Sequence, residues 1–291
     1  MASKMEETTT KEKMEKPDVD INSNPSVSSH SDLLEALSKM KELPDILQEG
    51  ILFMGGGVAI LLQAAIPGVI KEPQASEDLA VHLLENIQTT TSYIFCLTFG
   101  SKAQRKSLLD MLNRGGHLLN GSDPIFRLWV TATLYATATD IYQRIYGRVD
   151  YRTAERVYEE YTLLVSALNI PPELWPKDRQ KFWTYWDDTI VNIRDCPFRG
   201  LEKDLVLNFK RLPGWIRFMK PFLRVLTSEM LPPNVRKGYG LKSSKARRAL
   251  YRVTLGFAVA VYPTFPKSIR SYPQRFYLKK LEITLGGAAS A

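Results

Sequence analysis

The chain has 291 residues, of which 44% are hydrophobic and 24% are charged. A chain of this length and composition can bury a large core, so we expect one or two folded domains. Two cysteines exclude a disulfide framework, and three histidines nearly exclude a zinc site made only of protein ligands.

The net charge of +8 is unevenly distributed, because residues 201–291 contain 18 Lys and Arg residues against four Asp and Glu residues. Such a basic region is typical of a solvated helical surface, or of contact with an acidic partner such as anionic lipid or nucleic acid. We expect no nucleic-acid partner. Peripheral membrane contact through this third is the alternative to a solvated surface, and the protein is expected to be cytoplasmic.

The chain is expected to open with a disordered polar tail over residues 1–30. This segment is rich in Lys, Glu, Thr, Ser and Asn, has almost no large apolar residues, and has no signal-peptide core. The folded domain is expected over residues 31–285, followed by a flexible tail over residues 286–291. Its first short helix could be capped by Ser31 or Asp32, and Pro44 is expected to interrupt it.

Residues 51–70, ILFMGGGVAILLQAAIPGVI, form the most apolar run and contain no charge. Their length meets the rule for a membrane span. However, three glycines break the front and Pro67 breaks the back, which leaves Val58 to Ile66 as an uninterrupted helix of only about 14 Å. A hydrocarbon core is about 30 Å thick. The run therefore predicts a buried central helix entered through a glycine turn.

Helical spacing continues from Ser76 to the end of the domain, with no alternating strand pattern and no repeat. Gly100 and Gly147 are expected helix ends, Ser101 a cap, and Pro124 a helix start. The fold class is therefore all-α, a single globular multi-helix domain around the central buried helix. Further helices are expected within residues 151–170, 172–190, 213–230, 242–263 and 271–283.

The segment from residue 86 to residue 121 contains His117, the candidate for any chemistry that needs a fixed imidazole. His30 lies in the polar tail and His82 on a mixed helical face, so His117 remains by elimination. Gly115 and Gly116 before it would let a flat ligand or a second backbone approach closely. The alternative is an ordinary histidine at a helix end, close to the negative end of the helix dipole.

Searches for motifs exclude most familiar sites. The chain has no Walker loop, no GxGxxG after a strand, no HExxH and no CxxC pair, and no nucleophile-elbow sequence. What remains is a cofactor that brings its own chemistry and needs one axial ligand, and haem is the leading example. Small residues in the middle of the helix after Pro124 would allow close approach of either another helix or a planar cofactor.

The sequence resembles the fungal and bacterial oxygenase family that includes the mycophenolic-acid pathway oxygenase and the latex-clearing (rubber) oxygenases. The resemblance covers roughly Phe53 to Tyr277. It is carried by the order and spacing of several motifs: GGGVAILLQAAIPGV, TTTSYIF followed by FG, His117 with Gly121, DPIFRLWVTATLYATATDIYQRIYG, PPELWPKDRQKFWTYWDD and LPPNVRKGYGLKSSKARRALY.

The resemblance implies a distantly globin-like helical fold and haem-b-dependent cleavage of a carbon–carbon double bond in an isoprenoid chain by dioxygen. It implies that His117 binds the iron, that Thr90 lies on the oxygen side, and that Arg247 or Arg248 contacts the propionates. Related proteins at the endoplasmic reticulum imply peripheral attachment to that membrane.

The sequence also departs from the family pattern at several positions. Asn86 and Thr89 replace an arginine and a lysine, and Gly121 replaces a basic residue. Ile66 and Thr131 stand where histidines are frequent. Two functions follow. One is a haem oxygenase of secondary metabolism that acts with O2 on an apolar isoprenoid or polyketide-type substrate. The other is a haem-free descendant that binds an apolar small molecule or catalyses a non-redox cyclisation or isomerisation.

Overall fold

Helix-forming segments separated by glycines, prolines and polar caps account for the architecture. The computed structural model describes residues 30–66, 76–114, 124–193, 196, 214 and 220–288. No strand occurs among these residues, so the expected all-α class is confirmed. The elements are α1 (His30–Ser38), α2 (Glu42–Leu47), the 3-10 helix η1 (Gly50–Gly55), α3 (Gly56–Ala64), α4 (Ser76–Phe99), α5 (Lys102–Asn113), α6 (Pro124–Tyr146), α7 (Tyr151–Ala167), α8 (Arg179–Asn192), α11 (Lys220–Met230), α12 (Pro233–Gly238), α13 (Lys245–Val261), the 3-10 helix η3 (Tyr262–Thr264), α14 (Lys267–Arg270) and α15 (Tyr272–Ala288).

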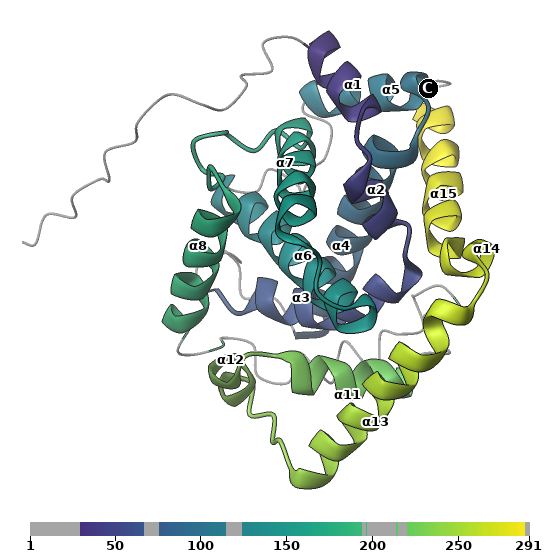
Figure 1. Ribbon diagram of the computed structural model, residues 1–291. Coiled ribbons are helices and arrows are strands. Elements are labelled where there is room, and N and C mark those ends of the chain that lie inside the picture. The colour runs from purple at the N-terminus through teal and green to yellow at the C-terminus, as the bar shows by residue number, and fades with distance from the viewer. Residues whose placement is uncertain are drawn as a thin grey trace, which may run out of the picture.

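The long helices α6, α4 and α7 form the body of the molecule, with α3 crossing beneath them (Figure 1). Helix α3 packs against α6, α4 and α11, and α6 also packs against η1 and α13. In Figure 1, α8 lies on one flank and α15 on the other, and α15 packs along α4. Helices α11 and α13 form a separate layer at the end of the molecule away from α1.

Local sequence signals set the helix ends as expected. Ser101 forms a capping box with Gln104 at the start of α5, which satisfies two backbone amides that have no partner within the helix. Helix α6 begins at Pro124, and Gly147 follows its end with a φ of 90°. Such a left-handed conformation favours glycine.

Two sequence expectations were wrong at their boundaries. Pro44 does not end a helix but lies in the first turn of α2, where an amide would have no helical partner in any case. Glu160 of α7 provides the acceptor for backbone amides at the start of α2. Its carboxylate accepts from the backbone nitrogens of Lys41 and Leu43 at 2.7 Å. The helix expected within residues 172–190 begins only at Arg179, because three prolines precede it.

Helix α3 is the expected central buried helix, since every residue from Val58 to Ala65 is buried. A buried helix end must have partners for its last carbonyl groups. The indole Nε1 of Trp129 in α6 donates to the carbonyl oxygen of Leu62 at 2.9 Å. The hydroxyl of Tyr239, after α12, donates to that of Leu61 at 2.7 Å. Two distant segments are therefore fastened to the end of α3.

The glycines before α3 act differently from the expectation of a turn. Gly56 and Gly57 belong to α3 itself, and η1 passes into α3 through Gly55, which has a helical conformation. A Cβ on Gly55 would lie 3.3 Å from side-chain atoms of Thr137 and Ile141 in α6. A Cβ on Gly57 would collide with Thr227 of α11. The glycines thus permit close packing of α6 and α11 on this segment.

Helix α3 has nine residues, far fewer than a membrane span needs. Residues 67–70 of the apolar run lie outside the described residues. Among the helices that the structure describes, none is both long and apolar enough to cross a membrane.

A partly buried ion pair fastens α14 to the loop before η1. The guanidinium of Arg270 donates to the Glu49 carboxylate at 2.6 Å, and Tyr146 of α6 donates its hydroxyl to the same carboxylate at 2.8 Å. Both charged side chains are largely shielded from solvent. Burial raises the pKa of Tyr146, and the hydrogen bond to the Glu49 carboxylate raises it further, so the hydroxyl keeps its proton as a donor at neutral pH.

The partners of the α3 carbonyls give a direct test of the core. Tyr239→Phe deletes one hydroxyl and leaves the Leu61 carbonyl in the core without that donor, so we expect the free energy of unfolding to fall by about 1–3 kcal/mol. Tyr277→Phe is the matched control, because this buried ring stacks on Phe53 and its hydroxyl makes no hydrogen bond in the described part of the chain. Urea denaturation measures both. An equal effect of the two substitutions would contradict the special role of Tyr239.

Candidate functional site

The threonine run of α4 places Thr90 in the interior. Its side chain is 1% exposed, and Ile87 and Ile94 on the same helical face are also buried. The Thr90 hydroxyl has no hydrogen-bond partner in the described part of the chain. An unpaired buried hydroxyl costs about 1–3 kcal/mol. Thr90 therefore presents an unpaired polar atom within apolar surroundings.

Other hydroxyl groups on α4 show that this lack is not a property of the helix. Ser92 donates to the carbonyl oxygen of Gln88 at 2.8 Å, and Thr98 donates to that of Ile94 at 2.7 Å. Both use the usual bond to the preceding turn. Thr90 does not make this bond, which leaves its hydroxyl available for a ligand or a water molecule.

A second polar group in the interior, the side-chain amide of Gln63 on α3, has a hydrogen-bond partner for only one of its two polar atoms. The Gln63 side chain is fully buried, and its Nε2 donates to the Thr133 hydroxyl of α6 at 3.0 Å. Its Oε1 has no partner among the described residues. The small residues of α6 face α3 and η1 at this level, so they serve helix packing, one of the two uses expected for them.

The predicted iron ligand cannot be placed next to these groups. His117 lies outside the described residues, together with Gly115, Gly116 and Gly121. Helix α5 ends at Asn113 and α6 begins at Pro124, so the two helices flank the segment that contains His117. Its role stays a prediction.

The two predicted propionate contacts lie on the surface. Arg247 and Arg248 are exposed in the first turn of α13, and Arg247 donates from Nη1 to the carbonyl oxygen of Lys242 at 2.9 Å. Arg127, which the sequence argument missed, is half-buried in the first turn of α6, and its Nε is buried without a partner among the described residues. Its place in DPIFR, soon after His117, was the available signal.

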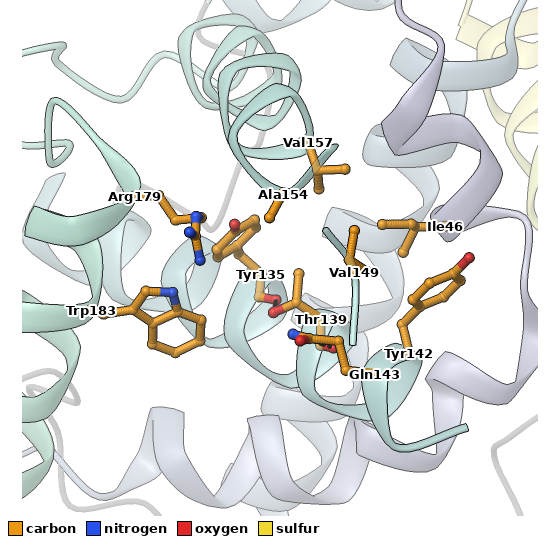
Figure 2. A pocket seen from close by; sticks show the side chains of 10 residues that line it. All are labelled: Ile46, Tyr135, Thr139, Tyr142, Gln143, Val149, Ala154, Val157, Arg179 and Trp183. Atoms are coloured by element: carbon orange, nitrogen blue, oxygen red, sulfur yellow. Dashed lines mark hydrogen bonds between the residues drawn. The ribbon is translucent and has the colours of Figure 1, made fainter. Parts of the chain in front are cut away.

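An aromatic pocket opens between α2, α6, α7 and α8 (Figure 2). Its volume is about 250 Å³. None of Thr90, Arg247 and Arg248 lines it. Its walls combine aromatic and aliphatic side chains with several polar ones; the lining residues are Ile46, Tyr135, Thr139, Tyr142, Gln143, Val149, Ala154, Val157, Arg179 and Trp183.

Tyr135 and Arg179 are two of the polar residues that line this pocket. Burial raises the pKa of the Tyr135 hydroxyl, and the nearby Arg179 guanidinium acts in the opposite direction. Arg179 donates from Nε to Glu155 at 2.8 Å and stacks on the Tyr151 ring at 5.3 Å. Its terminal nitrogens make no hydrogen bond in the described part of the chain and turn toward the pocket (Figure 2). A neutral hydroxyl and a cation are thus offered to a ligand.

Protein-only metal or thiol chemistry finds little support among the described residues. No three His, Cys, Asp or Glu side chains lie close enough there to hold a metal ion. Burial raises the pKa of the Cys96 thiol to about 11, so this cysteine is a poor nucleophile at neutral pH. Among the described residues, the polar atoms considered for a function are those of Thr90, Gln63 and Arg127, which belong to a larger set of buried atoms without a partner, and those of the pocket.

Comparison with known proteins then identifies the fold's family. The catalytic domain of the ER-bound oxygenase mpaB/B'/Rubber oxygenase family matches residues 44–260. The chain belongs to this family. The match covers most of the predicted domain and includes Thr90, the segment of His117, both arginines of α13 and the whole aromatic pocket. The protein is therefore an oxygenase-family enzyme, as the motifs indicated.

Two curated relatives are also similar to the chain. They are uncharacterized proteins of Mycobacterium bovis and of Mycobacterium tuberculosis. Each is 28% identical over 205 residues, which cover 65% of this chain and 80% of the relative. No solved structure matches the chain.

Thr90 can be tested without knowing any ligand. Thr90→Val keeps the shape of the side chain and removes the unpaired hydroxyl, so the free energy of unfolding of the cofactor-free protein should stay equal or rise by about 1 kcal/mol. Thr98→Val removes a hydroxyl that is bonded to the same helix and should lower it by about 0.5–1.5 kcal/mol. Urea denaturation compares the two. Equal losses would mean that the Thr90 hydroxyl already has a partner.

Proposed function

We propose that the protein is a haem-b-dependent oxygenase of secondary metabolism, which oxidises or cleaves a carbon–carbon double bond of an apolar isoprenoid or polyketide-type substrate with O2. The observation that carries this proposal is the buried, unpaired hydroxyl of Thr90. It lies within the catalytic domain that the chain shares with the oxygenase family. A haem supplies the activation of dioxygen when it is bound. The protein would supply ligands, polar groups and a dry interior.

The residues present fit a haem in three respects. Thr90 offers a hydroxyl among apolar side chains, as the oxygen side of a haem requires. His82 is exposed on α4, and His30 hydrogen-bonds Asn113 at the molecular edge. His117 is therefore the histidine that would bind the iron. A propionate needs a cation, and the Nε of Arg127 is buried with no partner in the part of the chain that the structure describes.

Each residue then has a separate task. Thr90 would donate a hydrogen bond toward the side on which dioxygen reacts, and the buried residues of α3 would exclude water from that region. Arg127 would pair with one propionate carboxylate. Arg247 and Arg248 remain candidates for the other. We place the enzyme in the cytoplasm, attached peripherally to the endoplasmic reticulum membrane, in agreement with the description of the family.

The ligand assignment has a spectroscopic test. The protein expressed with haem supplied should show a Soret band, and His117→Ala should lose it while helical content by circular dichroism is unchanged. His82→Ala, on the exposed face of α4, is the control and should keep it. Arg127→Met should release haem to apomyoglobin about tenfold faster, because about 1–3 kcal/mol of charge-assisted bonding is lost. A full haem complement in His117→Ala would refute the assignment.

The aromatic pocket favours a second candidate, the haem-free protein that binds or rearranges an apolar small molecule. Tyr135 and Arg179 could hold an acidic group of a ligand whose apolar part lies against Trp183 (Figure 2). A preparation without a Soret band, even after haem is supplied, would favour this function over the first.

The pocket can be tested with anilinonaphthalene sulfonate, an aromatic anion whose fluorescence reports binding. Arg179→Met should raise the dissociation constant about tenfold, because a charge-assisted bond of about 1.5–3 kcal/mol is lost. Arg152→Met, an exposed arginine outside the pocket lining, is the matched control. Binding that is equal in the two variants would show that the pocket does not hold the anion.

A further inference from the structure

The exposed apolar side chains gather on one part of the surface. Among the described residues, most of the large apolar side chains with high exposure lie in the segment that runs from α13 to the start of α15. They include Leu250, Val253, Phe257, Phe265, Ile269 and Tyr272. Figure 1 shows α13 outside α11 at the end of the molecule, and the chain then runs along the edge through α14. We call these six residues the outer apolar face.

Helix α13 is apolar on two sides. One side, with Tyr251, Leu255 and Ala258, packs against the core shared with α6 and α11. The other side has Leu250, Val253 and Phe257 at spacings of three and four, so they share one face in solvent. Burial within the molecule explains the first side, whereas the second side has no apolar partner among the described residues.

The same segment is strongly basic. Residues 241–281 contain ten Lys and Arg residues and no Asp or Glu residue. Arg270 forms an ion pair with Glu49, whereas Lys245, Arg252 and Lys267 are exposed around the outer apolar face. A helix with an apolar face, basic residues around it and too little length for a span is typical of helices that lie in a membrane interface.

We propose that the outer apolar face and its basic surroundings bind the surface of an anionic membrane, with α13 lying in the plane of the headgroups. The 17 residues of α13 would present about 25 Å of helix to the lipid. Phe257 and Val253 would enter the boundary of the acyl chains, and Arg252 and Lys267 would contact lipid phosphates.

Charge decides against the two other occupants. A symmetric dimer would place this face against its own copy, and its cations would then oppose cations without any acidic residue between 241 and 281 to pair with them. Nucleic acid would match the charge but would leave Val253 and Phe257 without apolar contact, because its surface is dominated by phosphates. Anionic lipid satisfies both the charge and the apolar side chains.

The experiment measures co-sedimentation of the full chain with vesicles of phosphatidylcholine alone or with 30% phosphatidylserine. We expect binding only to the anionic vesicles, and loss of binding in 0.5 M NaCl, where the screening length is a few Å. Arg252→Glu with Lys267→Glu should weaken binding at least fivefold for each site. Arg148→Glu with Lys177→Glu, exposed elsewhere, should have a much smaller effect.

The apolar contribution has a closely matched control. Val253 is 69% exposed on α13 and Val191 is 72% exposed on α8. Val253→Ser with Phe257→Ser should weaken binding tenfold or more, while Val191→Ser should not change it, and circular dichroism should show all variants folded. The inference rests on the peripheral membrane attachment proposed above and names the surface that makes it. Haem content has no part in this measurement, so a failure of membrane binding and a failure of the haem assignment are distinguishable.

Three results would overturn the proposal. One is equal vesicle binding by the Val253/Phe257 variant and the Val191 variant. Another is a concentration-dependent dimer in light scattering that Phe257→Ser abolishes, which would make the face an interface between copies. The third is salt-sensitive binding to nucleic acid without binding to anionic vesicles.

Discussion

The complete burial of α3 is the constraint on which the rest of the structure depends. A helix of nine residues with no exposed face needs neighbours all round, and its last carbonyl groups need donors that water cannot supply. Trp129 and Tyr239 supply them from α6 and from the turn after α12. The requirement of one short apolar segment therefore fixes the positions of two segments that are distant in sequence.

Against this background, the polar atoms that lack partners are informative. The buried hydroxyls of Thr133, Thr137 and Thr98 are all bonded, although their surroundings are as apolar as those of Thr90. Interiors rarely leave such atoms unpaired, and the exceptions need an explanation such as a ligand or water. Thr90 and Gln63 lie on α4 and α3, which pack against each other. The unpaired atoms therefore lie on the helix that carries the family motif TTTSYIF and on the helix packed against it.

The sequence predicted the helices better than their contacts. Caps and helix stops such as Ser101 and Gly147 act over a few residues, so local sequence determines them. Glycine before an apolar run can make a turn or allow a neighbouring helix to pack closely. The positions of α6 and α11 show that Gly55 and Gly57 have the second role, and local sequence does not encode those positions. Tyr277 lies in a basic segment whose local sequence does not show that it stacks on Phe53, more than 200 residues away in sequence.

The candidate site divides in the same way. Thr90 could be named from a motif, whereas the lack of a partner for the Arg127 Nε among the described residues depends on which groups the fold brings near it, which no local pattern encodes. The Tyr135–Arg179 pocket is lined by residues of α2, α6, α7 and α8, so its residues are spread over more than 130 positions. The positive charge of residues 241–281 could be predicted fully, because it follows from many Lys and Arg residues without Asp or Glu and is the same in any fold.

The outer layer and the interior are mechanically connected through a few polar contacts. Arg270 of α14 bonds Glu49 just before η1, and η1 leads directly into α3. Arg144 of α6 bonds the Tyr251 hydroxyl of α13 at 3.0 Å. Shielded ion pairs such as Arg270–Glu49 add little net stability, because desolvation offsets their attraction, but they favour one relative orientation of the parts that they join. The proposed membrane face would then hold a fixed orientation relative to α3, Thr90 and the interior in which an apolar substrate would react.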